Sequence, residues 1–245
     1  MRKIGAVSDE ILIATYNSRN RTVSNEHLTE IFEHIGRRFG YDEVSARFSP
    51  FADFKVKWQR SYKWIEFEVS DYLDRAPDNV IADLAESIFT RISGKESDYS
   101  EAVIRYLNDP VPRADNRRDF IERKREISNT SIGEFHDLND CVNRLRDAGL
   151  IPYDLECVLC WQQRPSGRKP SGCSVIQRVA WVSSELDRKG VPENVLDYAV
   201  YNALTYFIIG FGQRDIMEHE HDRMDALYPM REEALSWLHR NGFYI

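Results

Sequence analysis

The stretch VSSELDRKGVPENV, residues 182–195, nearly repeats a phrase that occurs earlier in the chain, VSDYLDRAPDNV at residues 69–80. Both phrases contain Val, Ser, Leu, Asp, Arg, Pro, Asn and Val in the same order. Elements of similar pattern flank both copies, so a tandem duplication explains the repeat better than chance. The repeat decides the fold class, and it raises the question of what the element that follows each phrase does.

A predicted helix precedes each phrase. The first is NEHLTEIFEHIGRRF (25–39) and the second is GEFHDLNDCVNRLRDAG (133–149), and both have apolar residues at helical spacing. We expect Asn25 to cap the start of the first helix and Gly149 to end the second.

Two predicted strands and a second helix complete each unit. The first strand of each unit ends in a Trp-Gln pair, the second strand alternates, and the helix begins at the proline of the repeated phrase. These segments are FKVKWQR (54–60) and CVLCWQQ (157–163), KWIEFEVS (63–70) and VIQRVAWVS (175–183), and PDNVIADLAESIFTRI (77–92) and PENVLDYAVYNALTYFII (192–209).

The sequence therefore predicts an α+β fold built from two tandem helix–strand–strand–helix units. We expect an N-terminal repeat unit at residues 1–110, a linker with a helix at 111–130, and a C-terminal unit at 131–245. The segment 94–115 contains one predicted helix followed by a proline-rich break, which places the boundary near residues 110–130.

The overall composition is that of a globular chain, with 42% hydrophobic and 30% charged residues among 245. No run approaches the roughly 20 apolar residues that a membrane helix needs. The N-terminal stretch MRKIGAVSDEILIATYN (1–17) contains Asp9 and Glu10 and is a poor secretion signal. We expect a cytoplasmic protein without a membrane partner.

The net charge of −7 argues against a large phosphate-binding surface. The most basic stretch, RADNRRDFIERKRE (113–126), alternates its arginines with acidic residues three and four positions away. This spacing predicts a solvated helix with ion pairs along it, and a nucleic-acid patch is the alternative.

The chain contains four cysteines, Cys141, Cys157, Cys160 and Cys173. Disulfides are not expected in a cytosolic chain, and the spacing C-x2-C-x12-C over the last three suggests zinc instead. However, a strand places Cys157 and Cys160 on opposite faces. We therefore favour apolar packing of these side chains over a zinc site.

Several segments of the second half share their order with a known family. They are HDLNDCVNRLRDAG (136–149), LECVLCWQQ (155–163), VSSELDRKGVPENVLDYAVYN (182–202) and LYPMREEALSWLHRNGF (227–243). In this order they resemble the SprT-like zinc metallopeptidases over roughly residues 133–245, and the first half looks like the duplicated upstream unit of some members. The resemblance implies a zincin-like fold for the C-terminal unit.

The family carries H-E-x-x-H on the helix that follows the phrase, where two histidines bind Zn²⁺ and the glutamate activates water. On this pattern Asn202 replaces the first histidine, Ala203 the glutamate and Tyr206 the second histidine. An amide is a poor zinc ligand, a methyl group accepts no proton, and a tyrosine ligates only as phenolate. The run Asn202-Ala203-Leu204-Thr205-Tyr206 thus implies that peptidase activity is lost. The aligned positions of the first unit are Ser87, Ile88 and Arg91.

The family has a further histidine after this helix, and the segment IMEHEHDRM (216–224) offers His219 and His221. The spacing does not choose between them. We expect this segment to be a solvated polar turn, because two histidines are too few ligands for zinc. No cofactor is expected, and zinc held by His219 and His221 is the alternative.

The helix 192–209 is rich in aromatic residues, which predicts either a core helix or a former cleft that now takes a peptide or a partner helix. We expect a catalytically inactive SprT-like homologue, a pseudoenzyme that acts as a protein-binding or scaffold protein with a protein partner or as a homo-oligomer. One alternative is a metal-dependent hydrolase or peptidase with a site drawn from Asn202, Tyr206, His219 and His221. Another is a nucleic-acid-associated protein, which the acidic charge disfavours.

Overall fold

The computed structural model describes residues 22–163 and 168–244. The chain divides into two compact units, Met1–Tyr106 (unit 1) and Leu107–Ile245 (unit 2), and each is described by itself. The expectations for residues 1–17 and for most of the glycine- and proline-containing loop before residue 168 lie outside the described residues. Among those described, no helix has the length and apolar character that a membrane span requires.

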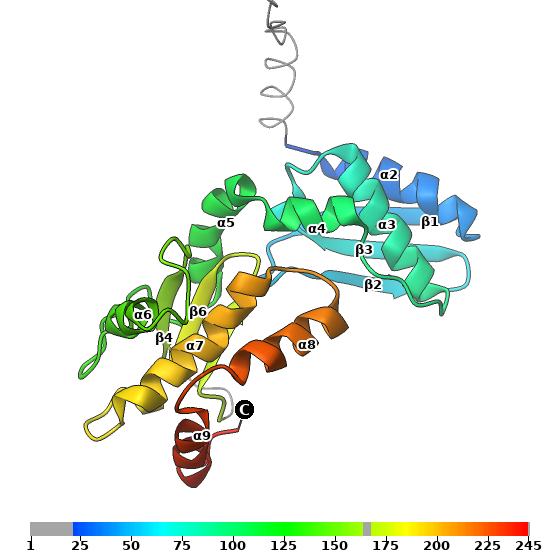
Figure 1. Ribbon diagram of the computed structural model, residues 1–245. Coiled ribbons are helices and arrows are strands. Elements are labelled where there is room, and N and C mark those ends of the chain that lie inside the picture. Colours follow the sequence, from blue (N-terminus) through cyan, green and yellow to red (C-terminus); the bar gives the residue numbers. More distant parts are fainter. Residues whose placement is uncertain (1–21, 164–167, 245) are drawn as a thin grey trace, which may run out of the picture. The chain divides into compact units, whose positions relative to one another are not determined.

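Unit 1 is a three-stranded sheet with two helices packed together against it (Figure 1). Strand β1 runs parallel to β3, and β2 is antiparallel to β3 at the edge, so the order is β1-β3-β2. The elements are α2 (Asn25–Arg38), β1 (Glu43–Ser49), β2 (Val56–Arg60), β3 (Trp64–Ser70), the short 3₁₀ helix η1 (Asp71–Leu73) and α3 (Asp78–Ile92). Helix α4 (Glu101–Asn108) then crosses the boundary between the units.

Unit 2 repeats this sequence of elements and adds helices at both ends (Figure 1). Its sheet has the order β4-β6-β5, again with a central strand parallel to the first and antiparallel to the edge strand. The elements are α5 (Pro110–Arg123), α6 (Leu138–Asp147), β4 (Val158–Gln162), β5 (Ser171–Ser174), β6 (Val179–Ser183), η2 (Ser184–Leu186), α7 (Glu193–Ile209), α8 (Arg214–Asp225) and α9 (Arg231–Arg240).

The α+β class is confirmed, but the predicted strand count of each unit is wrong by one. Among the described residues each unit has three strands, and the Trp-Gln pairs do not correspond. The pair in unit 1 lies on the edge strand β2, whereas the pair in unit 2 lies on β4, whose counterpart is β1. Equivalent hydrogen bonds fix this alignment, because the Ser70 N–H donates to the Lys55 carbonyl at 3.1 Å and the Ser183 N–H to the Pro170 carbonyl at 2.9 Å.

Three boundaries differ from those expected. Ser24, not Asn25, caps α2, and its hydroxyl accepts the His27 N–H at 3.2 Å. Helix α6 begins only at Leu138, capped by the carboxylate of Asp137. The segment 175–178, expected as strand, is the turn between β5 and β6, where Arg178 has a φ of 55°.

The repeated segment of each unit forms hydrogen bonds with the residues just before the helix that precedes its sheet, which is α2 in unit 1 and α6 in unit 2. In unit 2 the Asp187 carboxylate accepts the N–H groups of Glu134, Phe135 and His136 at 2.5, 3.0 and 3.0 Å. Gly133 precedes them because a Cβ there would lie 2.2 Å from the Asp187 carboxylate. In unit 1 the Asp74 carbonyl accepts the Val23 N–H at 2.6 Å. The repeated segment therefore connects a parallel strand to a helix, and it also forms hydrogen bonds with the residues that precede α2 or α6.

The predicted helices after both phrases are confirmed, with Pro77 and Pro192 immediately before α3 and α7. Proline is suited to this place because its missing N–H would have no helical partner there. Most of α7 is buried among α6, α8, α9 and the sheet, as expected of a core helix. In unit 1 the core centres on the rings of Phe32, Phe67 and Phe89, with centroids 4.8 to 6.4 Å apart.

Helix α5 occupies the stretch expected as a solvated ion-paired helix, and that expectation is only partly right. The ion pairs Arg118–Glu122 and Arg123–Asp119 lie along it at 3.9 and 3.6 Å. However, Phe120 is 0% exposed and its ring lies 6.4 Å from that of Trp181 in β6. The Arg113 and Arg117 side chains donate to the carbonyls of the β5–β6 turn. One side of α5 is therefore packed on the sheet of unit 2.

Candidate functional site

The three positions that the resemblance aligns with the H-E-x-x-H motif line one cleft of about 800 Å³ in unit 2. Asn202, Ala203 and Tyr206 project from the C-terminal half of α7. Helix α8 contributes His221 and Asp222, and the edge strand β5 contributes further lining residues. Asn202 and Tyr206 are only partly buried, in contrast to the rest of this half of α7 before Ile208. The cleft therefore coincides with the site that the sequence alignment indicates.

The structure selects His221 over His219. The His221 ring stacks on the Tyr206 ring with centroids 4.0 Å apart and an interplanar angle of 16°. His221 is 8% exposed, whereas His219 is exposed and does not line the cleft. The expected polar turn is wrong, because this segment is α8. Residues at i and i+2 diverge around a helix, so only one of the two histidines can reach α7.

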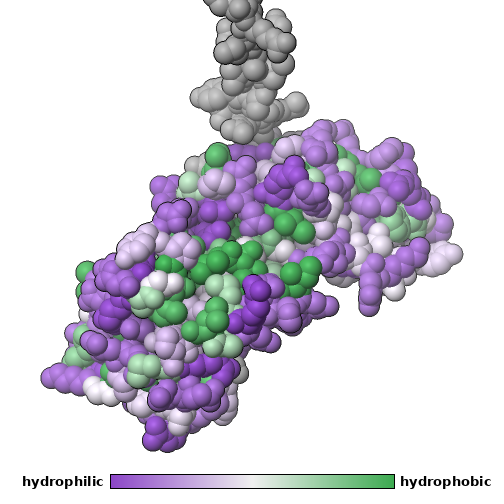
Figure 2. Space-filling model, viewed as in Figure 1, coloured by the Kyte–Doolittle hydropathy of each residue, from purple (hydrophilic) through white to green (hydrophobic). Residues whose placement is uncertain are grey.

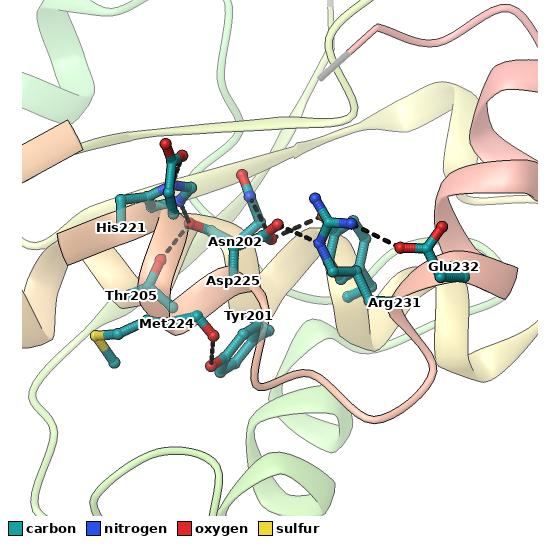
Figure 3. Close-up of polar contacts among 10 residues, drawn as sticks. Tyr201, Asn202, Thr205, His221, Met224, Asp225, Arg231 and Glu232 are labelled. Carbon is teal, nitrogen blue, oxygen red and sulfur yellow. Dashed lines mark hydrogen bonds and ion pairs between the residues drawn. The ribbon is translucent and has the colours of Figure 1, made fainter. Parts of the chain in front are cut away.

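His221 is held by the backbone of α7. Its Nε2 lies 3.0 Å from the Asn202 carbonyl oxygen, which also accepts the Thr205 hydroxyl at 2.8 Å (Figure 3). A carbonyl can only accept, so Nε2 carries the proton and Nδ1 of the neutral ring is an acceptor. The Nδ1 atom lies 4.0 Å from Asp222 Oδ1, which is too far for a hydrogen bond.

A buried carboxylate, Asp225, binds the other polar groups of the cleft floor. It is 6% exposed and accepts the Tyr198 hydroxyl at 2.7 Å, the Asn202 amide at 3.2 Å and Arg231 Nε at 2.6 Å (Figure 3). Burial, followed by the hydrogen bond to Asp225, raises the pKa of Tyr198. One N–H of the Asn202 amide is therefore engaged in an internal network.

The Tyr206 phenol and the Cys173 thiol, which both line the cleft, have raised pKa values and keep their protons. Burial is the main cause that raises the pKa of Tyr206, and Cys173 with the carboxylates of α8 adds to it. Burial also raises the pKa of the Cys173 thiol to about 12. A neutral phenol and a neutral thiol are poor metal ligands and poor nucleophiles. The floor of the cleft is thus suited to contact and hydrogen bonding.

The cysteines occupy separate environments. All four are free thiols, with Cys141 in the core of unit 2 and Cys173 at the cleft. Cys160 is 0% exposed on β4, and burial raises its pKa to about 11. Within residues 22–163 and 168–244, no three His, Cys, Asp or Glu side chains lie close enough together to hold a metal ion.

The cleft surrounds the edge of strand β5 that pairs with no other strand in the described part of the chain, and this edge is called the open edge. The Pro170–Ser183 hydrogen bond sets the alternation, so Gly172 and Ser174 face β6. The N–H and C=O groups of Ser171 and Cys173 consequently point to the open edge. Both residues line the cleft, as do Tyr206 on one face of the strand and Trp181 on the other. An extended chain can therefore pair with this edge and place alternate side chains on the two faces.

Sequence reasoning missed Asp225, Arg231 and Tyr198 as parts of the site. Asp225 lies one helical turn after His221, and Arg231 follows the Tyr-Pro segment that resembles the family's closing motif. Helical spacing from His221 was the only sequence signal for Asp225. A scan of protein-family models and searches of curated proteins and of solved structures find no match to this chain.

Proposed function

We propose that unit 2 is a degenerate SprT-like, zincin-type domain that has lost catalysis and binds a protein segment in its cleft. One observation carries this proposal: Asn202, Ala203, Tyr206 and His221 converge in a single cleft beside an open strand edge. These are the positions at which the resemblance expects the zinc ligands and the catalytic base. The convergence supports the alignment, and the residue types support the loss of catalysis.

The chemistry of the floor supports binding over hydrolysis. Ala203 supplies no base, and the Asn202 amide donates to Asp225 at 3.2 Å. His221 Nε2 is engaged by a backbone carbonyl at 3.0 Å, so the ring cannot present that nitrogen to a metal without breaking the contact. Activation of a water molecule needs a metal or a base with a free lone pair in position. His221 Nδ1 alone does not supply this arrangement.

The mode of binding that the cleft supports is addition of an extended segment to β5. Main-chain hydrogen bonds from Ser171 and Cys173 give such a segment its register, and the two faces of the cleft read its alternate side chains. The occupant is a segment of a protein partner, and a second copy of this chain is an outcome that the experiment distinguishes.

The test is selection of linear peptides from a displayed random library on the full chain, followed by binding to two proline variants. Ser171→Pro removes an N–H at the open edge without removing a bond to β6. Val56→Pro makes the same change at the same register of β2 in unit 1. We expect Ser171→Pro to weaken peptide binding by about tenfold, the value of one main-chain hydrogen bond. Val56→Pro should leave it unchanged.

Three results would change the proposal. Equal weakening by both proline variants would place the binding elsewhere. Dimerisation that Ser171→Pro abolishes would identify the partner as a second copy. Stoichiometric zinc in protein purified without chelators, lost on His221→Ala, would overturn the inactive assignment in favour of a metal-dependent hydrolase.

A further inference from the structure

We infer that the cleft recognises a basic side chain, lysine or arginine, through the pair of acceptors His221 Nδ1 and Asp222 Oδ1. This inference rests on the proposed function, because it names the chemistry of the segment that the cleft takes. It assigns His221 and Asp222 as the residues that determine which segment binds.

The first supporting observation is the state of the His221 ring. The residue is 8% exposed, lines the cleft, and has its Nε2–H bonded to the Asn202 carbonyl at 3.0 Å. Its stacking on Tyr206 fixes the ring plane. Nδ1 is therefore a fixed acceptor in a largely buried ring, and in the described part of the chain no hydrogen-bond donor reaches it. An acceptor that no protein donor reaches can accept a hydrogen bond from a ligand that enters the cleft.

The second observation is that Asp222 is the carboxylate of this wall that pairs with no lysine or arginine among the described residues; its basic neighbour is the His221 ring, at 4.0 Å. Glu218 pairs with Arg214 at 2.7 Å, Glu220 with Arg223 at 2.6 Å, and Asp225 with Arg231 at 2.6 Å. Glu218, Glu220 and Asp225 are the other acidic residues of α8 from residue 217 to its end, so each of them has an arginine partner. The Asp222 side chain is 88% exposed and lines the cleft beside His221.

The distance between the two acceptors suits one cation. Nδ1 and Oδ1 are 4.0 Å apart, so an ammonium or guanidinium group can lie within hydrogen-bond distance of both. The wall is negative around this point, since Glu218, Asp222 and Asp225 all act on Tyr206 in the same direction. Two basic residues that line the cleft are engaged by other groups: Arg231 Nε is bonded to Asp225 at 2.6 Å, and the Lys124 ammonium is 4.2 Å from the centroid of Trp181.

The experiment follows the His221 ring nitrogens by NMR in the full chain. The probe is Nα-acetyl-arginine N-methylamide, and Nα-acetyl-citrulline N-methylamide is the neutral match of the same shape. We expect the arginine probe to shift Nδ1 saturably and to bind about tenfold more tightly than the citrulline probe, as for a charge-assisted hydrogen bond. Asp222→Asn should remove this preference.

The matched control is Asp215→Asn, which neutralises another exposed carboxylate on α8 that does not line the cleft. It should leave the preference for arginine intact. His221→Phe keeps a stackable ring without the acceptor and should also abolish the preference. Equal binding of both probes, or an undiminished preference in Asp222→Asn, would overturn the inference.

The failure of this inference and that of the proposed function give different results. If selected peptides require the Ser171 edge but bind equally well to Asp222→Asn, the proposed function stands and the inference fails. If the arginine probe binds at His221 but no peptide depends on the edge, the basic-side-chain site stands and the strand-addition mode fails.

Discussion

Two sheets of the same order and register differ most on the face turned away from their paired helices. In unit 2 this face carries Cys160 and Val179, both 0% exposed. At the aligned positions of unit 1 stand Arg47 and Glu66, both exposed to solvent. A face with apolar residues needs a cover, and α5 provides one by packing Phe120 on Trp181. The two sheets have the same strand order, so the difference comes from the side chains on the face opposite the paired helices. Apolar side chains on that face favour the packing of a further helix, and charged side chains do not.

The two units also differ where unit 2 has its cleft. Arg91, aligned with Tyr206, donates to the Ser97 carbonyl at 2.6 Å and lies over the Tyr99 ring at 4.3 Å. The chain after α3 thus contacts this position in unit 1. In unit 2 the equivalent residue stacks on His221 and borders an open cleft. In the view of Figure 2, apolar side chains gather in a patch on the surface of unit 2, and polar side chains surround it.

The largest effect on stability is expected from the packing of helix α5 on the sheet of unit 2. Phe120→Ala should lower the free energy of unfolding by about 3–5 kcal/mol, because it removes a fully buried ring from the contact with Trp181. Glu68→Ala, at the position aligned with Trp181, should cost less than about 1 kcal/mol, since its partner Arg47 is exposed. Urea unfolding measures both, and similar costs would contradict the comparison.

A second contrast concerns the ion pair between α6 and α7. Arg144 binds Asp197 through both Nε and Nη2 at 2.6 to 3.2 Å, and the aligned residues of unit 1 are Ile31 and Ala82. Asp197→Ala should cost about 3 kcal/mol, because it leaves a half-buried guanidinium unpaired. The double variant Arg144→Ile with Asp197→Ala should recover most of this loss. Thermal and urea unfolding measure these losses. If the loss in the double variant equals the sum of the losses in the two single variants, the apolar pair of unit 1 cannot replace the ion pair in unit 2.

Tyr206→Ala is expected to have a smaller effect. The sequence predicts a loss of about 2–4 kcal/mol for a core position. Tyr206 is partly exposed at the cleft, so we expect about 1–2 kcal/mol from lost apolar burial. Peptide binding should fall together with the His221 stacking, as measured in the same preparation. A loss above this range, with binding unchanged, would make Tyr206 a purely structural residue.

The smallest expected effect is a pH dependence in unit 1. Asp78, at 2.9 Å, and Glu30, at 3.1 Å, raise the pKa of His27. The stabilisation is therefore complete below the unfolded pKa of about 6.5 and is lost as pH rises through the raised folded pKa. Compared with His27→Gln, the wild type should melt slightly higher at acidic pH, and the difference should vanish above about pH 8. A difference that grows with pH would have the wrong sign.

The sequence predicted α2, α3, α6 and α7 well, because apolar spacing and proline starts are local signals, but it took the α8 segment for a polar turn. It missed β1 because the shared Trp-Gln pairs suggested a different alignment. It also missed β5, whose residues SGCS have no apolar alternation and form a strand only by pairing with β6. The site was predicted at Asn202 and Tyr206 by alignment. The choice of His221 and the roles of Asp225 and Arg231 depend on how α8 packs, which no local pattern encodes.

The hydrogen bonds between Asp187 and residues 134–136 have a consequence for biosynthesis. The carboxylate reaches back 53 residues to Glu134, so the entrance to α6 leaves the ribosome well before the group that fixes it. Unit 1 has the same order, since Val23 is made long before Asp74. The residues before α2 and α6 therefore gain these hydrogen bonds only after the repeated segment of the same unit has been synthesised.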